Sequence, residues 1–545
     1  MKIINFFNKF RATFLFKKLN LAVPKNYNTN NKNKKNVLVE FNAFCFMHII
    51  LSAFLNVLKK NNYCNFYAYR SHLLLSYDVE YNFIEKIKKI LAVFFNIGTF
   101  GIYKSLGISN FIEFKIDNKI RKLSLIKKNK IMKTIKKKQD INNIKINGVL
   151  IGDLIYDTFL KKNYDLKPTI DIKSERFLDF LEKFLQLYFL WNNFIIKKKI
   201  NLVLCSHNVY TLGIPSRICA HNNGEAFIIE HDRLTRLNKN NIFKYSITKK
   251  YKSMFSKLKK NKQLEYIRAA KKSLKSRFEG SLEDLNYMTS TAFSKNKVKN
   301  EFLKFPKNTY KVLVAPHDFV DAPHVYGKFI FPDMYEWIKY LCNLSKSSSF
   351  TWLIKTHPIM NEKYKSYQAY TRKVIDTLIK DSKFTLVDPN TSHNELIKKY
   401  KVNCVLTVSG TIAHEYAYHG IKVINASSKN MHESYKFNLH AKSLEDYEKM
   451  IKNINLRPNI NINELASCYY MHYDYCDQNW FFKDLNSTIK NIQGYHNLFT
   501  YKIYEEWLKI YSDNYFKTNL KNIENFVNSK DLVFTKKIKN IENEK

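Results

Sequence analysis

The C-terminal half of the chain alternates short apolar runs with longer amphipathic stretches, and this alternation constrains the fold more than any other feature. Short runs rich in Val, Leu and Ile are typical of buried strands. Strands that alternate with helices predict a parallel, doubly wound sheet. The expected strands cover residues 311–315, 350–355, 384–387, 403–408 and 422–425, and the expected helices cover 334–344, 362–380, 394–400 and 411–419.

The N-terminal half shows the same alternation, with expected strands at 37–40, 64–69, 202–206 and 226–229 and helices at 47–60 and 177–198. At 545 residues, the chain is too long for a single ordinary core. We therefore expect an α/β protein with two Rossmann-like, doubly wound lobes and a cleft between them. The expected parts are a basic N-terminal segment (1–35), an N-terminal lobe (36–235) that contains a Lys-rich helical insertion (111–140), a Lys-rich helical linker (236–305), a C-terminal lobe (306–440) and a C-terminal helical region (441–545).

The chain is strongly basic, with 91 Lys and Arg against 47 Asp and Glu and a net charge of +44. Attraction to a polyanion is one explanation. The other is a base composition that favours Lys, Asn and Ile codons, and the even spread of charge along the chain favours it. The eight cysteines contain no Cys-x-x-Cys pair, so we expect neither a zinc site nor a disulfide framework, and a reducing, cytoplasmic location fits.

The N-terminus is basic and rich in aromatic residues, and it lacks the pattern of a cleavable signal peptide. Such a segment suits an anionic membrane surface or a helix packed on the body of the protein, and the sequence favours neither. The uncharged run 41–58 contains Asn42, His48, Ser52 and Asn56, and it follows a strand. It therefore predicts the first loop and helix of an α/β lobe rather than a membrane span.

Two motifs follow expected strands of the C-terminal lobe. In the first, Ser409, Gly410 and Thr411 lead into a helix that carries Glu415. Hydroxyls and free backbone N–H groups at a helix start suit a phosphate, and Gly410 lets an anion approach the backbone closely. Glu415 is a candidate acceptor for ribose hydroxyls. Plain helix capping explains the same residues without a ligand.

The second motif, His357-Pro358, follows the expected strand 350–355. A residue before proline is held extended, which aims His357 into a cleft. Ligands of doubly wound sheets bind at the carboxyl ends of the strands, where both motifs lie. Together they predict a seat for a nucleotide mono- or diphosphate.

Other ionisable residues also follow expected strands. His317 ends the first strand of the C-terminal lobe and is a candidate catalytic residue. A metal site built from His317, Asp321 and His324 lacks the usual spacing, so we expect no metal. In the N-terminal lobe, Asp153 or His207 is a candidate general base for an acceptor hydroxyl, although polar caps and turns explain both equally well.

This pattern resembles the GT-B glycosyltransferases of bacterial capsule and surface-polysaccharide synthesis, especially the capsule Kdo transferases and their sialyltransferase-like relatives. The resemblance covers residues 36–440 in architecture, and its specific motifs lie within 311–425. It implies that His357, Pro358, Ser409 and Thr411 hold the nucleotide phosphate of the donor. His317 stands where a Gln is often found, and the acidic pair followed by Gly that serves polysialyltransferases as base is not visible here.

The sequence therefore predicts a metal-independent, cofactor-free glycosyltransferase that uses a nucleotide-sugar donor linked to CMP, UDP or GDP. Its expected acceptor is a surface polysaccharide or a lipid-linked glycan, with peripheral contact to the anionic inner face of the cytoplasmic membrane. A CDP-glycerol or ribitol type of polyol-phosphate transferase is an alternative, and a nucleotide-sugar epimerase fits the long helical regions poorly. A basic nucleic-acid-binding protein is a third alternative, although no known nucleic-acid motif supports it.

Overall fold

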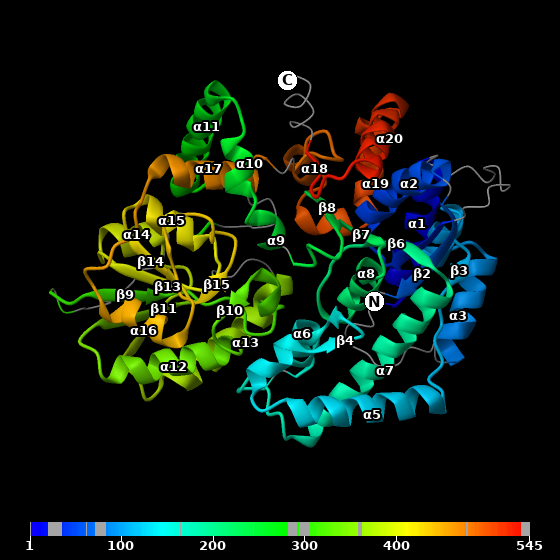
Figure 1. The fold of residues 1–545 in the computed structure, drawn as a ribbon. Coiled ribbons are helices and arrows are strands. Elements are labelled where there is room, and N and C mark those ends of the chain that lie inside the picture. Colours follow the sequence, from blue (N-terminus) through cyan, green and yellow to red (C-terminus); the bar gives the residue numbers. More distant parts are fainter. Residues whose placement is uncertain are drawn as a thin grey trace.

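The structure is a computed structural model, and it shows two α/β lobes side by side, each built on a six-stranded sheet (Figure 1). This confirms the predicted fold class. The structure describes residues 2–19, 35–61, 63–70, 83–163, 165–243, 245–281, 291–293, 306, 308–357, 362–475 and 478–535.

The sheet of the N-terminal lobe has the strand order β3-β2-β1-β6-β7-β8. All neighbouring strands are parallel except β7 and β8. In its centre, Val37 pairs with Phe66 on one side and with Leu202 on the other. The strands are β1 (Lys35–Phe41), β2 (Tyr63–Arg70), β3 (Asn110–Phe111), β6 (Ile200–Cys205), β7 (Glu225–Ile229) and β8 (Leu234–Leu237).

The sheet of the C-terminal lobe is parallel throughout, with the order β12-β11-β9-β13-β14-β16. Its central strands are buried along their whole length, which explains why they are continuous apolar runs in the sequence. The strands are β9 (Lys311–Val314), β11 (Thr351–Lys355), β12 (Phe384–Val387), β13 (Cys404–Thr407), β14 (Lys422–Asn425) and β16 (Leu439–His440).

Both sheets have the strand order of a Rossmann fold, with the first strand of each lobe in the centre of its sheet. The chain moves outward from β1 through β2 to β3, then returns to place β6 on the other side of β1. The C-terminal lobe repeats this path around β9 and β13. Each pair of central strands is therefore a topological switch point, where open α/β sheets bind ligands at the strands' carboxyl ends.

The helices of the N-terminal lobe cover both faces of its sheet. α7 begins where the Ser174 side chain accepts a hydrogen bond from the Phe177 N–H, and α5 begins in the same way at Asp117. The predicted helical insertion at 111–140 is shorter than expected, since Ile135 is extended and ends α5. The helices are α1 (Lys2–Lys18), α2 (Cys45–Lys60), α3 (Phe83–Phe94), α4 (Gly98–Ser105), α5 (Asn118–Thr134), α6 (Gly152–Lys162), α7 (Glu175–Lys197) and α8 (Gly213–His221), with a hairpin of β4 (Lys145–Ile146) and β5 (Val149–Leu150).

The helices of the C-terminal lobe follow the predicted order along the chain. Asp333 caps α12, and Ser392 caps α14, each by accepting a backbone N–H of the first turn. The helices are α12 (Met334–Lys346), α13 (Glu362–Ile379), α14 (His393–Lys398), α15 (Ile412–Tyr418), α16 (Leu444–Lys452) and α17 (Ile462–Tyr473), and a small sheet pairs β10 (Lys328–Phe329) with β15 (Ser427–Lys429).

The C-terminal helices are divided between the two lobes. α17 packs against α10 (Tyr251–Ser256) and α11 (Lys260–Phe278) on the C-terminal lobe. The chain then crosses back, and α19 and α20 lie on α2 of the N-terminal lobe (Figure 1). Trp480 and Trp507 are buried in the same cluster as α2. The remaining helices are α9 (Tyr245–Thr248), α18 (Leu485–Asn491), α19 (Lys502–Ile510) and α20 (Asp513–Asn528).

Candidate functional site

The carboxyl ends of the two sheets face one another across the boundary between the lobes. Tyr210, which follows β6, donates a hydrogen bond from its hydroxyl to Asp321, which follows β9, at 3.0 Å. Lys161 at the end of α6 lies 3.4 Å from the same carboxylate. The loops that leave the two switch points are therefore in direct contact.

The switch point of the C-terminal lobe brings His317 and Gly410 together. A Cβ atom at position 410 would lie 3.4 Å from two atoms of the His317 ring. Burial lowers the pKa of His317 to about 4, against the opposing effect of Asp321, so the ring is neutral at physiological pH. His317 and Gly410 therefore lie next to each other, as expected from their places after neighbouring strands. Ser409, beside Gly410 in the chain, is buried.

His357 extends from the neighbouring strand β11. The side chain of His357 is exposed. Desolvation by the surrounding protein, with smaller effects of His317 and Lys355, lowers the pKa of His357 to about 4. Pro358 lies outside the described residues.

Lys355 is the cation that the sequence analysis did not select. It is 3% exposed at the end of β11, and its Nζ lies 3.5 Å from His393 Nε2. It forms no ion pair within the described part of the chain. Burial lowers the pKa of its ammonium to about 8, although Asp388 and Glu415 act in the opposite direction. A buried ammonium without an adjacent counter-ion suits an anionic ligand.

Two expectations about the Ser409 motif need correction. Thr411 stands at the N-cap of α15, but no side chain caps the helix. α15 has only seven residues, so its dipole contributes less than the sequence suggested. Side chains near Gly410, such as the His317 ring, must therefore contribute most of any phosphate binding there.

Glu415 is not placed to hold a ribose. Its Oε1 atom accepts hydrogen bonds from Nε and Nη2 of Arg277 on α11, at 2.8 and 2.5 Å. Both side chains are buried. Glu415 therefore joins the linker helix to the C-terminal lobe, which is a structural role.

Asp153 is likewise not placed to act as a general base. It lies at the start of α6, buried, and forms a bidentate ion pair with Arg217 at 2.5 Å for each contact. A carboxylate held in this way is not accessible to an acceptor hydroxyl. Asp153 stabilises the packing of α6 on α8.

His207 stands at the switch point of the N-terminal lobe and is exposed. Its Nδ1 atom lies 2.8 Å from the Ser206 Oγ atom. The Ser206 hydroxyl and backbone N–H both donate to the buried carboxylate of Glu40, at 2.9 and 2.5 Å. The sequence analysis missed Glu40, although a charged residue in a central strand was a signal for it.

This series of hydrogen bonds, from His207 through Ser206 to Glu40, selects one tautomer of His207. The Ser206 hydroxyl has a single proton, and it donates that proton to Glu40. The Ser206 oxygen must then accept a proton from His207 Nδ1. The Nε2 atom of His207 is left with its lone pair, as a general base requires.

The proposed ligands of a metal do not converge. His324 is turned away from His317, because its Nδ1 atom contacts Asp157 at 2.5 Å and its Nε2 atom contacts the Pro332 carbonyl. Over the described ranges, no group of three or more His, Cys, Asp or Glu side chains is arranged to hold a metal ion.

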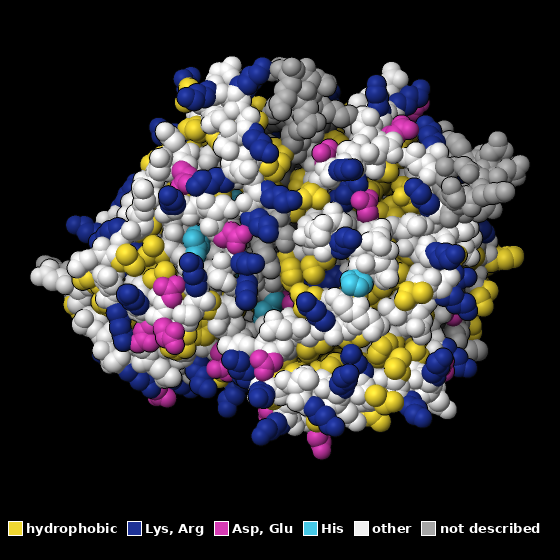
Figure 2. All heavy atoms as spheres, in the orientation of Figure 1, with side chains coloured by type: hydrophobic (Ala, Val, Ile, Leu, Met, Phe, Trp, Pro, Cys, Tyr) yellow, Lys and Arg dark blue, Asp and Glu magenta, His cyan; other side chains and the backbone are white. Residues whose placement is uncertain are grey.

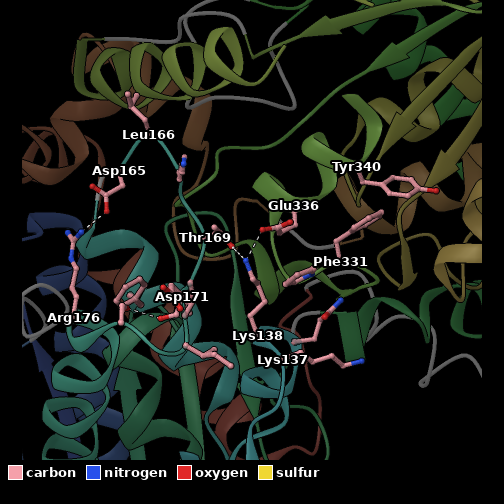
Figure 3. Close-up of a pocket in the computed structure, with 17 residues that line it drawn as sticks. Lys137, Lys138, Asp165, Leu166, Thr169, Asp171, Arg176, Phe331, Glu336 and Tyr340 are labelled. Atoms are coloured by element: carbon pink, nitrogen blue, oxygen red, sulfur yellow. Dashed lines mark hydrogen bonds and ion pairs between the residues drawn. The ribbon is translucent and has the colours of Figure 1, made fainter. Parts of the chain in front are cut away.

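A hollow of about 1040 Å³ lies where α7 and α12 begin, lined by both lobes (Figure 3). Two of its cations are already neutralised, since Lys138 contacts Glu336 at 2.7 Å and Arg176 contacts Asp165 at 2.5 Å. None of the predicted site residues lines it. It is therefore a poor seat for the donor phosphate.

Comparison with known proteins gives no family assignment. No protein-family model matches the sequence, and no curated protein matches it. Among solved structures, KpsC from Thermosulfurimonas dismutans, a beta Kdo 2,4 transferase, is 12% identical, with 50% of this chain and 80% of that chain covered and a TM-score of 0.29. The UDP-GlcNAc 2-epimerase of Neisseria meningitidis is 11% identical, with 81% and 98% covered and a TM-score of 0.23. MurG of Acinetobacter baumannii is 10% identical, with 80% and 95% covered and a TM-score of 0.19.

TM-scores this low support no conclusion about the function of this protein. The two-lobe, Rossmann-like fold rests on the strand order of this chain, and the candidate site rests on its own side chains.

Proposed function

We propose that the protein is a glycosyltransferase of the GT-B type, which moves a sugar from a nucleotide-sugar donor to a surface polysaccharide or a lipid-linked glycan. The observation that carries the proposal is the pairing of two switch points. In this proposal, Lys355, His357 and Gly410 form an anion seat on the C-terminal lobe, and His207 acts as the base on the N-terminal lobe. The C-terminal lobe binds the donor, and the N-terminal lobe binds the acceptor.

In the proposed reaction, the acceptor hydroxyl oxygen forms a bond to the anomeric carbon while the bond from that carbon to the phosphate oxygen breaks. His207 Nε2 takes the proton of the hydroxyl. The negative charge that develops on the leaving nucleotide is stabilised by the Lys355 ammonium, by His357 and by donors around Ser409. A base and a leaving group on opposite lobes favour an in-line displacement that inverts the anomeric centre.

The transfer needs no metal in this proposal, because the Lys355 ammonium takes the place of Mg²⁺ at the phosphate. CMP, UDP and GDP are the donor nucleotides that we propose, with CMP-linked acidic sugars implied by the resemblance to Kdo transferases. We propose a cytoplasmic location with peripheral contact to the inner membrane. None of the described helices is long and apolar enough to cross a bilayer.

A nucleic-acid-binding function has less support. Lys and Arg side chains are scattered over the whole visible face in Figure 2, whereas nucleic-acid binding needs them gathered along a path. On that face, the basic residues behind the net charge of +44 do not gather into one patch.

A thermal-shift screen with CMP, UDP, GDP and CDP-glycerol tests the proposal. We expect one nucleotide to raise the melting temperature of the wild-type protein, and His357→Ala to reduce the shift. His221→Ala, which replaces an exposed histidine at the end of α8, near the amino end of β7, is the matched control. If no nucleotide shifts the melting temperature, or if both variants behave alike, the donor seat is wrong. A shift with CDP-glycerol alone would favour a polyol-phosphate transferase.

A further inference from the structure

The outer side of the N-terminal lobe carries a group of large apolar side chains exposed to solvent. They lie on α1, on α3 and at the residue that follows α3, and we call them the α1–α3 surface. Three are strongly exposed: Phe94 at 77%, Ile90 at 65% and Phe95 at 60%. The full set is Phe10, Phe14, Ile87, Ile90, Leu91, Phe94 and Phe95.

Contacts between the helices hold the two parts of this surface together. The Gly98 N–H donates to the Thr13 Oγ1 atom at 2.8 Å. Thr13 directly precedes Phe14, and Gly98 lies three residues after Phe95. α1 and α3 both pack against α4. The two pairs of exposed phenylalanines therefore belong to neighbouring parts of one surface.

The arrangement of these residues is that of a binding face. One apolar stripe runs along α3, formed by Ile87, Ile90, Leu91 and Phe94. In most globular proteins, such a stripe on a surface helix faces the core. α1 buries one face, since Thr13 and Phe16 are buried, but Phe10 and Phe14 are exposed. Single exposed apolar residues are common, but a group of this size marks an interaction site.

The charged side chains of α1 and α4 are all basic, and one of them, Arg11, is paired with Glu505 of α19. Lys9, Lys17 and Lys18 are exposed on α1, and Lys104 is exposed on α4. Neither helix contains an acidic residue. The Lys18 ammonium lies 4.7 Å from the centre of the Phe14 ring, so charged and aromatic groups are interleaved. Apolar side chains flanked by lysines match the interface of a bilayer that contains anionic lipids.

We propose that the α1–α3 surface binds an anionic lipid bilayer, with Phe94, Phe95, Phe10 and Phe14 inserted below the headgroups and the lysines against the lipid phosphates. α3 lies at the edge of the molecule farthest from the C-terminal lobe (Figure 1). Binding of a membrane at α3 would therefore keep the C-terminal lobe away from the bilayer. The inference does not depend on the reaction in the cleft. It names the residues through which the protein meets the membrane.

Sedimentation with vesicles tests this inference. We expect the full-length protein to sediment with vesicles of phosphatidylcholine and about one quarter phosphatidylglycerol, and much less with pure phosphatidylcholine. The double variant Phe94→Ser, Phe95→Ser should lower the partition coefficient by about tenfold or more. The matched control is Leu264→Ser, Ile454→Ser, which replaces exposed apolar residues of the other half of the molecule. All four side chains are exposed, so both variants should keep the wild-type melting temperature.

Three results would overturn the inference: no binding of the wild-type protein to anionic vesicles, equal loss in the two double variants, or unchanged vesicle binding together with loss of self-association in the Phe94, Phe95 variant. The last result would assign the surface to a second copy of the chain. Nucleotide binding by the same variants should be unchanged, which separates failure of this inference from failure of the donor seat.

Discussion

The Nδ1 atom of His207 lies 2.8 Å from the Oγ atom of Ser206. Because Ser206 gives its own proton to Glu40, this contact selects one tautomer of the imidazole and leaves Nε2 as a proton acceptor. A residue chosen from sequence as one of two alternative bases thus acquires a defined chemical state. Asp153, the other alternative, is held by Arg217.

Replacing His207 by Gln should lower kcat by about 10²- to 10⁴-fold, the usual contribution of a general base. Donor affinity should stay within about twofold, because the anion seat lies on the other lobe. Steady-state kinetics and nucleotide titration of the same preparation measure the two effects. A variant that loses donor affinity but keeps kcat would contradict the assigned role.

Ser206 is a positioning residue in this account, and Ser206→Ala should lower kcat less than loss of His207 does. Without the Ser206 hydroxyl, His207 Nδ1 loses its hydrogen-bond acceptor, so both tautomers of His207 become populated. The pH profile of kcat should change shape while the KM for the donor stays constant. An unchanged pH profile would show that Ser206 does not act through His207.

Nucleotide affinity should weaken in alkaline solution. The pKa of Lys355 is lowered by burial to about 8, and a bound phosphate raises it again. Binding therefore takes up a proton above that pH, and affinity should fall by up to about tenfold per pH unit. Calorimetric titration in buffers of different ionisation enthalpy detects the proton. Lys355→Met should bind weakly at every pH and lose this dependence, and a wild-type affinity that is constant up to pH 9.5 or so would rule out Lys355 as a ligand.

The lobes are joined by a buried ion pair with its own pH dependence. Burial opposes the charge on His324, but the Asp157 carboxylate raises the pKa of that histidine to about 9. The folded pKa exceeds the unfolded value of about 6.5, so the stabilisation is complete below about pH 6.5 and is lost as pH rises through about 9. Urea unfolding at both ends of this window measures it.

Removing one partner of this pair should be costly. His324→Gln leaves the Asp157 carboxylate buried without its cation, and the free energy of unfolding should fall by about 3 kcal/mol at neutral pH. Lys183→Gln breaks an exposed ion pair with Asp179 and should change it by less than about 1 kcal/mol. Equal effects of the two variants would mean that the pair does not hold the lobes together.

The sequence predicted five of the six strands of the C-terminal sheet to within one residue at each end, because each is a short apolar run bounded by polar residues. It missed β16, which has only two residues. It also placed His317 and Gly410 at carboxyl ends that proved to be adjacent. This followed from the geometry of parallel sheets, in which these ends share one edge.

Sequence analysis could not separate carboxylates in a site from carboxylates in structural ion pairs. Asp153 and its partner Arg217 are 64 residues apart, and Glu415 and its partner Arg277 are 138 residues apart. Only the tertiary structure reveals these partners. Glu40 was missed for the same reason, since its partner Ser206 lies 166 residues away.

The proposed phosphate site lies against Gly410, and a pair of glycine variants tests whether the phosphate binds there. Gly410 lies outside the left-handed region, and a Cβ atom there meets only ordinary contacts, so Gly410→Ala should fold with unchanged or slightly higher stability. The added methyl occupies the place of the anion. Gly420 follows α15 with a φ of +75° and open space around it, so Gly420→Ala should cost about 1 kcal/mol of stability without touching the seat.

The decisive measurement is calorimetric titration of both variants with the nucleotide found in the screen. We expect Gly410→Ala to lose at least about tenfold in affinity, or 1.4 kcal/mol, while it keeps its melting temperature. We expect Gly420→Ala to melt at a lower temperature but to bind as the wild type does. Wild-type affinity in Gly410→Ala would mean that the phosphate does not bind against Gly410.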